Sequence, residues 1–172
     1  AEIEASVKLS NRITWNGNLT ISDNKITRYT AYIDNWDTWE QEEIEYENTD
    51  LAFSPKQIWS SVLNYNLDNN ITINFISKYV GEQFIDNTSS ENRKLSDYLT
   101  NNLLVSYKWA SKIFKTSKIT LQINNLMNNE YVSNAWVYQF ISEDWDPRDS
   151  DPYINSDSER GYNMAGYFPE AT

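Results

Sequence analysis

The chain has 172 residues, of which 40% are hydrophobic, and it contains neither cysteine nor histidine. The absence of cysteine excludes disulfides, and no apolar stretch approaches the roughly 20 residues of a transmembrane helix. A formal net charge of −11 argues against nucleic acid as a partner, because phosphates demand a basic surface. The common general base and the thiol nucleophile are both missing, and no Gly-x-Ser-x-Gly motif occurs, so we expect neither an enzyme nor a cofactor.

Six runs of residues alternate between apolar and polar side chains, as strands with one apolar face do. The runs cover residues 3–9, 13–22, 59–67, 71–79, 99–109 and 119–124. Only Ser61 and Val62 interrupt the alternation of the third run. The pattern predicts an all-β chain of antiparallel strands.

The connections between these runs alternate strictly in length. Tight polar turns lie around Asn11-Arg12 and at 68–70, a slightly longer turn follows Trp109, and long segments cover 31–55, 84–97 and 127 to the end. Connections sorted in this way are typical of an outer-membrane β-barrel, in which short turns face the periplasm and long loops face outward. We therefore predict an incomplete, up-and-down transmembrane barrel of about six strands, located in the cell outer membrane.

The apolar face meets either lipid or a protein core, because a half-buried soluble sheet has the same alternation. Polar faces rich in Asn, Ser and Thr suit a hydrated lumen, and aromatic residues gather near the ends of the runs as in a membrane girdle. We place Trp15, Trp59, Tyr65, Tyr107 and Trp109 near the short turns, and Tyr79, Phe84 and Tyr131 near the long loops. We favour lipid; a soluble β-sheet carbohydrate-binding module and a structural outer-membrane protein without transport are the alternatives.

Both ends of the sequence predict a piece of a larger barrel. Nothing that resembles a cap precedes Ile3, and we expect no strand to return from the last long loop before Thr172. Six strands are also fewer than the eight of the smallest membrane barrels. Alone, such a sheet would expose two unpaired edges.

Residues 121–131, Leu-Gln-Ile-Asn-Asn-Leu-Met-Asn-Asn-Glu-Tyr, resemble an element near the C-terminus of TonB-dependent outer-membrane receptors: a strand, Asn-Leu-Phe-Asn, two residues and Tyr. Further segments are similar to receptors of the Bacteroidota in particular: 51–55, 79–84 with 86–88, 132–136 and 161–172. Residues 3–6, 17–20 and 24–26 resemble the barrel segment before these. The resemblance covers essentially the whole chain, in order.

In that family a barrel encloses an N-terminal plug, and the periplasmic protein TonB pulls on the plug to admit a ligand. The resemblance implies that residues 1–172 are the C-terminal portion of such a barrel, without the plug domain and the final strand. The implied partners are outer-membrane lipid, the remainder of the same barrel with its plug, and TonB through the missing N-terminal part; a surface lipoprotein is left open. The family imports siderophores, haem, glycans, peptides and cobalamin, and the resemblance does not select among these ligands.

Large aromatic residues in the long loops are the candidate ligand-binding residues: Trp36, Trp39, Trp136, Tyr138, Trp145 and Tyr153. Their rings suit stacking on a sugar ring or on a siderophore catechol. The alternative is that they pack loop against loop and hold irregular segments in place.

The long loops are also acidic, with one stretch at 34–50 and another at 143–159. In the second, Asp144, Asp146, Asp149 and Asp151 offer the oxygen ligands that Ca²⁺ prefers. The segment lacks the spacing and the glycine of an EF-hand loop, and Arg148 would compete with a cation. We therefore expect a solvated acidic loop and no metal site.

Overall fold

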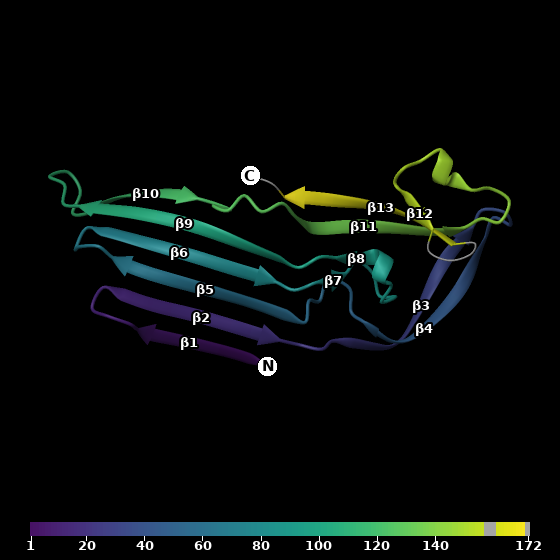
Figure 1. The fold of residues 1–172 in the computed structure, drawn as a ribbon, viewed down its shortest axis with the longest axis horizontal. Coiled ribbons are helices and arrows are strands. Elements are labelled where there is room, and N and C mark those ends of the chain that lie inside the picture. The colour runs from purple at the N-terminus through teal and green to yellow at the C-terminus, as the bar shows by residue number, and fades with distance from the viewer. Residues whose placement is uncertain (157–160, 171–172) are drawn as a thin grey trace.

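The computed structural model describes residues 1–156 and 161–170, the last two by their backbone only. Asp157 and Glu159 of the second acidic stretch, and Ala171 and Thr172 of the last resembling segment, lie outside the described residues. The described chain forms thirteen β-strands and two short 3-10 helices, which confirms the all-β prediction (Figure 1). None of the helices in this part of the chain is long and apolar enough to cross a membrane.

The six predicted runs form one antiparallel sheet of neighbouring strands. In spatial order these are β1 (Glu2–Lys8), β2 (Ile13–Ile21), β5 (Gln57–Asn66), β6 (Ile71–Val80), β9 (Tyr98–Trp109) and β10 (Ser117–Ile123). The three short turns lie together at one end and the long connections leave from the other (Figure 1). The predicted sorting of the connections by length is therefore confirmed, although the sheet is open and forms no closed barrel.

In each short turn a side-chain oxygen accepts hydrogen bonds from backbone amides two and three residues later in the chain. The Ser10 Oγ accepts from the amide of Arg12 at 3.1 Å, and the Asp68 Oδ1 accepts from the amide of Asn70 at 2.7 Å. Ser111 does the same in the longer third turn. Short polar side chains accept the hydrogen bonds of the turn amides without a partner from elsewhere in the fold. The residue types of the turn therefore suffice to predict it from the sequence.

The register places the apolar residues of the six strands on one face. Its central row crosses the whole sheet through Val7, Trp15, Leu63, Phe75, Leu103 and Ile123. Stacked aromatic pairs lie on both sides of this row, Trp59 with Tyr79 and Tyr107 with Trp109, each with ring centroids 5.6 Å apart. The placement of Trp59 near a short turn is wrong, because β5 begins at Gln57 and Trp59 therefore lies at the long-connection end.

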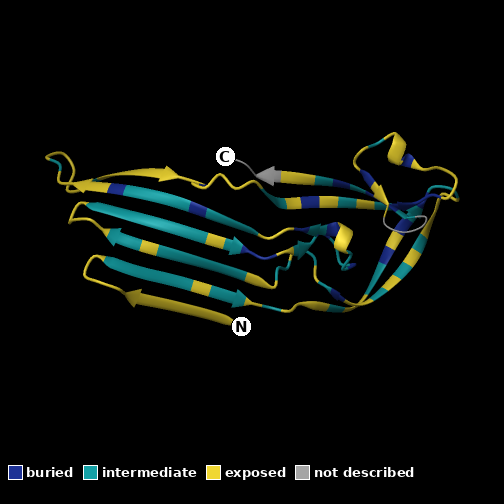
Figure 2. Ribbon diagram, viewed as in Figure 1, coloured by how far each residue is buried: buried dark blue, intermediate teal, exposed yellow. Residues whose placement is uncertain are grey.

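The apolar face has no layer of described protein over it. Within the six strands only Val80, Asn101 and Ser106 are buried, and two of these are polar (Figure 2). A soluble sheet of this composition would bury alternate residues against a second layer. Here most apolar side chains of the six strands remain half-buried or exposed; at the cap end Tyr98 stacks on Tyr131 of the cap, with ring centroids 4.2 Å apart.

The long connections contain further strands, so their prediction as loops is wrong. A five-stranded sheet has the order β12 (Ile154–Ser156), β13 (Gly161–Glu170), β11 (Tyr131–Ile141), β3 (Lys25–Asn35) and β4 (Glu40–Asp50). The remaining elements are a small pair of strands, β7 (Gln83–Phe84) and β8 (Lys94–Leu95), and the helices η1 (Glu91–Arg93) and η2 (Pro147–Asp149). We call the two smaller sheets and their helices the cap.

The strands of the cap correct two predictions about the number and order of strands. The total exceeds about six strands, and β13 does return, antiparallel to β11, where no returning strand was expected. The acidic density of β4 hid its alternation: Ile44 and Tyr46 pack on the buried Ala31 and Ile33, while the intervening glutamates point away.

Among the residues whose burial is described, the buried apolar side chains lie in the cap except for Val80. Three clusters form there: Ala31, Ile33 and Ile141; Ile85, Leu95 and Ala135; and Phe140, Ile154 and Tyr162. A short parallel pairing of Phe140 with Asp34 joins the β11–β13 hairpin to the β3–β4 hairpin. The molecule thus consists of an uncovered sheet and a packed cap at its long-connection end.

Candidate functional site

Five aromatic rings from four parts of the chain meet in the cap. Trp36 stacks on Phe140 with ring centroids 4.0 Å apart and on Trp145 at 5.9 Å, with interplanar angles of 12° in both pairs. Phe140 also stacks on Tyr138 at 5.9 Å and on Tyr162 at 5.5 Å. Phe140 is fully buried, whereas Trp145 keeps 49% of its surface exposed. We call these five residues the aromatic cluster; it has a packed centre and an accessible rim.

A chain of hydrogen bonds fixes the polar edge of the cluster. The Trp36 Nε1–H donates to the hydroxyl of Tyr138 at 3.2 Å, and this hydroxyl donates to Oδ2 of Asp34 at 2.6 Å. The bond from Tyr138 lowers the pKa of Asp34, and Gln41 adds to the effect. Desolvation raises the pKa of Tyr138, and its bond to Asp34 raises it further. At neutral pH the edge therefore presents a carboxylate held by a protonated phenol.

The structure brings together three of the six predicted ligand-binding residues. Trp36, Tyr138 and Trp145 belong to the aromatic cluster. Trp39, at the tip of the β3–β4 hairpin, is 88% exposed, and Tyr153 is 69% exposed. At the centre of the cluster the rings pack on one another, as the packing alternative expects. The rings at the rim are exposed, so ligand binding there stays a prediction.

Trp136 lies beside the cluster, and its ring covers a glycine. A Cβ atom added to Gly166 on β13 would lie 2.2 Å from the Trp136 Nε1, so only glycine allows this close approach. Phe140 and Tyr162 were not predicted. Aromatic residues at every second position, Trp136, Tyr138 and Phe140, place three rings on one face of a strand, and this spacing would have identified Phe140.

A buried arginine joins the segment between β6 and β9 to the rest of the cap. Arg93 is 1% exposed, and its Nε lies 2.6 Å from Oδ2 of Asp86. Its other nitrogens donate to the hydroxyl of Thr88 and, at 3.1 Å, to Oδ1 of Asn163 on β13. The side-chain oxygen of Gln139 on β11 lies 3.1 Å from the same two nitrogens when the amide is oriented to satisfy both groups. One side chain therefore ties three elements together.

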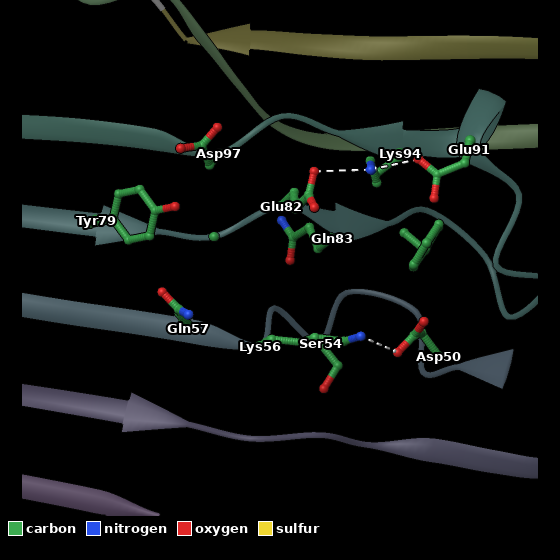
Figure 3. A pocket seen from close by; sticks show the side chains of 12 residues that line it. Asp50, Ser54, Lys56, Gln57, Tyr79, Glu82, Gln83, Glu91, Lys94 and Asp97 are labelled. Atoms are coloured by element: carbon green, nitrogen blue, oxygen red, sulfur yellow. Dashed lines mark hydrogen bonds and ion pairs between the residues drawn. The ribbon is translucent and has the colours of Figure 1, made fainter. Parts of the chain in front are cut away.

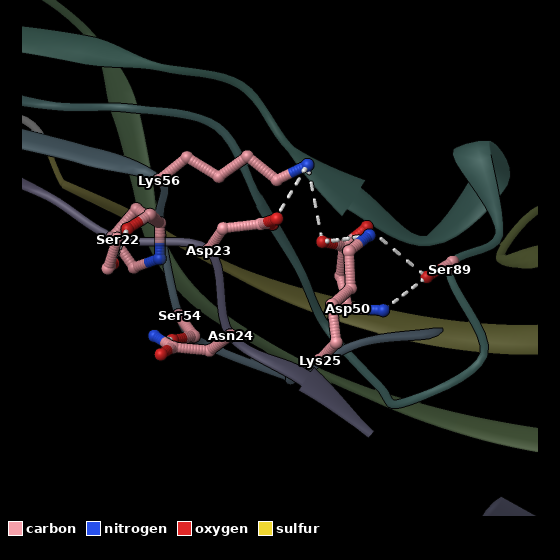
Figure 4. A network of polar contacts seen from close by, with 9 residues as sticks. Ser22, Asp23, Asn24, Lys25, Asp50, Ser54, Lys56 and Ser89 are labelled. Carbon is pink, nitrogen blue, oxygen red and sulfur yellow. Dashed lines mark hydrogen bonds and ion pairs between the residues drawn. The ribbon is translucent and has the colours of Figure 1, made fainter. Parts of the chain in front are cut away.

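A surface network at the base of the cap connects β3 and β4 to the start of β5 (Figure 4). Asp50 pairs with Lys25 at 2.8 Å and with Lys56 at 3.3 Å, and its backbone amide donates to Ser89 at 2.7 Å. Burial opposes the ionisation of Asp50, but the hydrogen bonds from both lysines outweigh it and lower its pKa. The network holds the root of the β3–β4 hairpin in place.

A polar groove of about 500 Å³ opens where β5 and β6 meet the cap (Figure 3). Lys94 lines it, with Nζ 2.6 Å from Glu91 and 3.0 Å from Glu82. These two hydrogen bonds raise the pKa of Lys94, Glu91 contributing more. Across the groove the hydroxyl of Tyr79 is hydrogen-bonded to Asp97. Sequence reasoning gave no indication of this groove.

The described residues contain no group of three or more carboxylates placed to hold a metal ion. In the second acidic stretch Asp146 caps η2 and pairs with Arg148 instead: the Arg148 Nε donates to both carboxylate oxygens, at 2.9 and 3.0 Å, and the Arg148 backbone amide donates at 3.0 Å. Asp151 accepts from the backbone amide of Tyr153 at 2.9 Å. The competition from Arg148 that the sequence suggested is present in the structure.

The pairing with Arg148 predicts a pH dependence of the η2 turn. It lowers the pKa of Asp146 from 3.8 to about 2. Because the pKa is lower in the folded state, the stabilisation is complete above about pH 4 and disappears as the pH falls through about 2. A carboxyl NMR titration should give a midpoint near 2 for Asp146 and a higher midpoint in Arg148→Met, which loses the side-chain bonds but keeps the bond from the backbone amide of residue 148. A normal midpoint in the unchanged protein would contradict the pairing.

Comparison with known proteins identifies no family. No protein-family model and no curated protein matches the chain. Among solved structures, the chain is similar to the closed form of the ferric-catecholate import receptor Fiu from E. coli K12, with 10% identity and a TM-score of 0.41 over 98% of this chain. The chain spans 27% of that receptor. A likeness at this level does not establish membership of a family.

Proposed function

We propose that this chain is part of the membrane-spanning barrel of a TonB-dependent outer-membrane receptor that imports a ligand into the periplasm. One observation carries the proposal: a six-stranded antiparallel sheet has an uncovered apolar face with stacked aromatic pairs toward both ends. A lipid-facing band between two aromatic girdles has this arrangement. The opposite face, rich in Asn, Ser and Thr, suits a wet lumen.

In this proposal the short turns face the periplasm and the cap faces the outside of the cell. The rim of the aromatic cluster, with Tyr138 and Trp145, and the exposed rings of Trp39, Trp136 and Tyr153 then border the ligand vestibule. Flat aromatic surfaces beside the carboxylate of Asp34 suit a ligand that offers both a ring face and hydrogen-bond donors. Siderophores and glycans combine these features.

Sidedness tests the proposal directly. A short epitope inserted near Glu43 or Ser150 in the full-length protein should bind antibody on intact cells, because both positions lie in the cap. An epitope at Asn69, in the turn between β5 and β6, should react only after the outer membrane is breached. Surface reactivity at Asn69 but not at Glu43 would reverse the orientation.

The competing function is a soluble β-sheet module that binds carbohydrate. It requires the apolar faces of two copies or two sheets to cover each other. A monodisperse, cooperatively melting protein in detergent-free buffer, with all three epitopes equally accessible, would favour that function and reject the barrel.

A further inference from the structure

The turn between β9 and β10 differs from the other two short turns in what it exposes. The turns at 10–12 and 68–70 consist of polar residues alone. The turn at 110–116 contains Ile113 and Phe114, whose exposed fractions are 85% and 65%. Two adjacent large apolar side chains at the tip of a turn favour an apolar environment, because leaving them in water costs free energy.

Lysines surround this exposed apolar pair. Lys112 and Lys115 flank it in the sequence, and Lys108 and Lys118 lie near the ends of the two strands. All four are exposed, and among the described side chains no carboxylate forms an ion pair with them. Residues 98–129 include no Asp or Glu. This end of β9 and β10 is therefore a basic region in a chain with a net charge of −11.

Two of the lysines face each other across the hairpin. The register places Lys118 directly opposite Lys108, on the polar face of the sheet. Like charges directly opposite each other on neighbouring strands are destabilising. An anion at this end of the sheet would relieve the repulsion, and the described residues supply none from their own carboxylates.

The apolar tip continues the uncovered face of the sheet. Tyr107 and Trp109 lie on that face directly before the turn, with stacked rings whose centroids are 5.6 Å apart. An apolar tip, an aromatic pair and lysines side by side are the composition of a segment that lies at the interface of a bilayer. In the proposed barrel this end meets the periplasmic leaflet, whose lipids are phospholipids.

We propose that the turn at 110–116 is an anchor for anionic phospholipid. Ile113 and Phe114 insert at the boundary between headgroups and acyl chains, and Lys112 and Lys115 bind the lipid phosphates. Lysine suits this role because its apolar stem follows the hydrocarbon while its ammonium stays among the headgroups. The inference rests on the proposed barrel and adds the lipid charge that its short-turn end selects.

Local fluorescence quenching of the full-length protein in vesicles tests this inference. Thr116→Cys carries a fluorophore in the turn, and a small fraction of either phosphatidylglycerol or phosphatidylcholine carries a nitroxide near the headgroup, in vesicles otherwise made of phosphatidylcholine. We expect stronger quenching by the labelled phosphatidylglycerol. Lys112→Gln and Lys115→Gln should each lower this preference about fivefold, since one lysine near an anionic surface contributes about 1 kcal/mol. Higher salt should lower it as well.

Matched variants locate the effect. Lys78→Gln removes one lysine from the polar face of β6, near the long-connection end, and should leave the preference unchanged. A fluorophore on Asn69→Cys reports on a turn at the same end that contains Asp68 and no lysine, and it should show a smaller preference. Ile113→Ser combined with Phe114→Ser keeps the lysines and should reduce quenching by both lipids alike.

Equal quenching by the two lipids at position 116, or the same loss in Lys78→Gln, would overturn the inference while leaving the barrel in place. Quenching by neither lipid in a protein that has entered the vesicles would place the turn outside the bilayer, and an acidic protein would then be the partner to seek. Loss of the preference on adding soluble glycerol phosphate would also overturn it, because the lysines would then bind free phosphate. Failure of the protein to enter vesicles would reject both the barrel and the anchor.

Discussion

Arg93→Met should detach the segment between β6 and β9 from the rest of the cap. The substitution leaves Asp86 without its ion pair and leaves the side-chain oxygen of Asn163 without its donor in a buried environment. Removing one partner of a buried ion pair costs on the order of 3 to 5 kcal/mol, because the remaining charge stays desolvated. The effect should be local, since the partners of Arg93 described above all lie in the cap.

Hydrogen exchange of the full-length protein would measure this effect. Amides of residues 81–97 should exchange hundreds of times faster in Arg93→Met, since about 3 kcal/mol corresponds to slightly more than two powers of ten. Amides in the centres of β5 and β6 should be unchanged. Arg148→Met removes an arginine from an exposed pair and serves as the control. Equal exchange in all three proteins would show that Arg93 does not hold the cap together.

The matched double variant separates the ion pair from the packing around it. Arg93→Met combined with Asp86→Leu removes both charges, and an apolar pair in a buried site is often as stable as the ion pair it replaces. Protection of residues 81–97 should therefore recover in part. No recovery would point to the bonds with Thr88, Gln139 and Asn163 as the larger contribution.

Local chemistry explains which parts of the fold the sequence predicts. Each of the six strands carries its own alternation, and each short turn has its own Ser or Asp acceptor, as at Ser10 and Asp68. Neither signal depends on distant residues. The cap differs, because the acidic side chains of β4 obscure the apolar positions Ile44 and Tyr46, whose burial depends on Ile141 almost one hundred residues away.

The same distinction applies to the candidate site. Aromatic residues in the long connections were identifiable from their type, but only the fold shows that Trp36, Tyr138 and Trp145 meet while Trp39 and Tyr153 do not. Arg93 and the polar groove were not identifiable, since a lone Arg in a polar segment has no local pattern. The contact of Arg93 with Asn163 spans 70 positions.

Leu63→Arg should destabilise the barrel, and Asn64→Arg should be tolerated. Leu63 lies in the central row of the apolar face, opposite Trp15 and Phe75, where a lipid-facing arginine costs about 2 to 4 kcal/mol at the bilayer midplane. Asn64 follows on the opposite, polar face and makes only a 3.4 Å bond to the carbonyl of Thr14. The two positions are adjacent on β5 and occupy opposite faces of the sheet.

Folding of the full-length protein into lipid vesicles, followed by urea unfolding, measures both variants. Ile73→Arg and Leu103→Arg should repeat the effect of Leu63→Arg, because both lie on the same face within one row of it. Asn102 is a poor control on the polar face, since its side-chain oxygen accepts a hydrogen bond from the amide of Asn125 at 2.8 Å. Equal loss of stability at Leu63 and Asn64 would mean that both faces meet protein, because lipid on one side and water on the other cannot penalise the same charge alike.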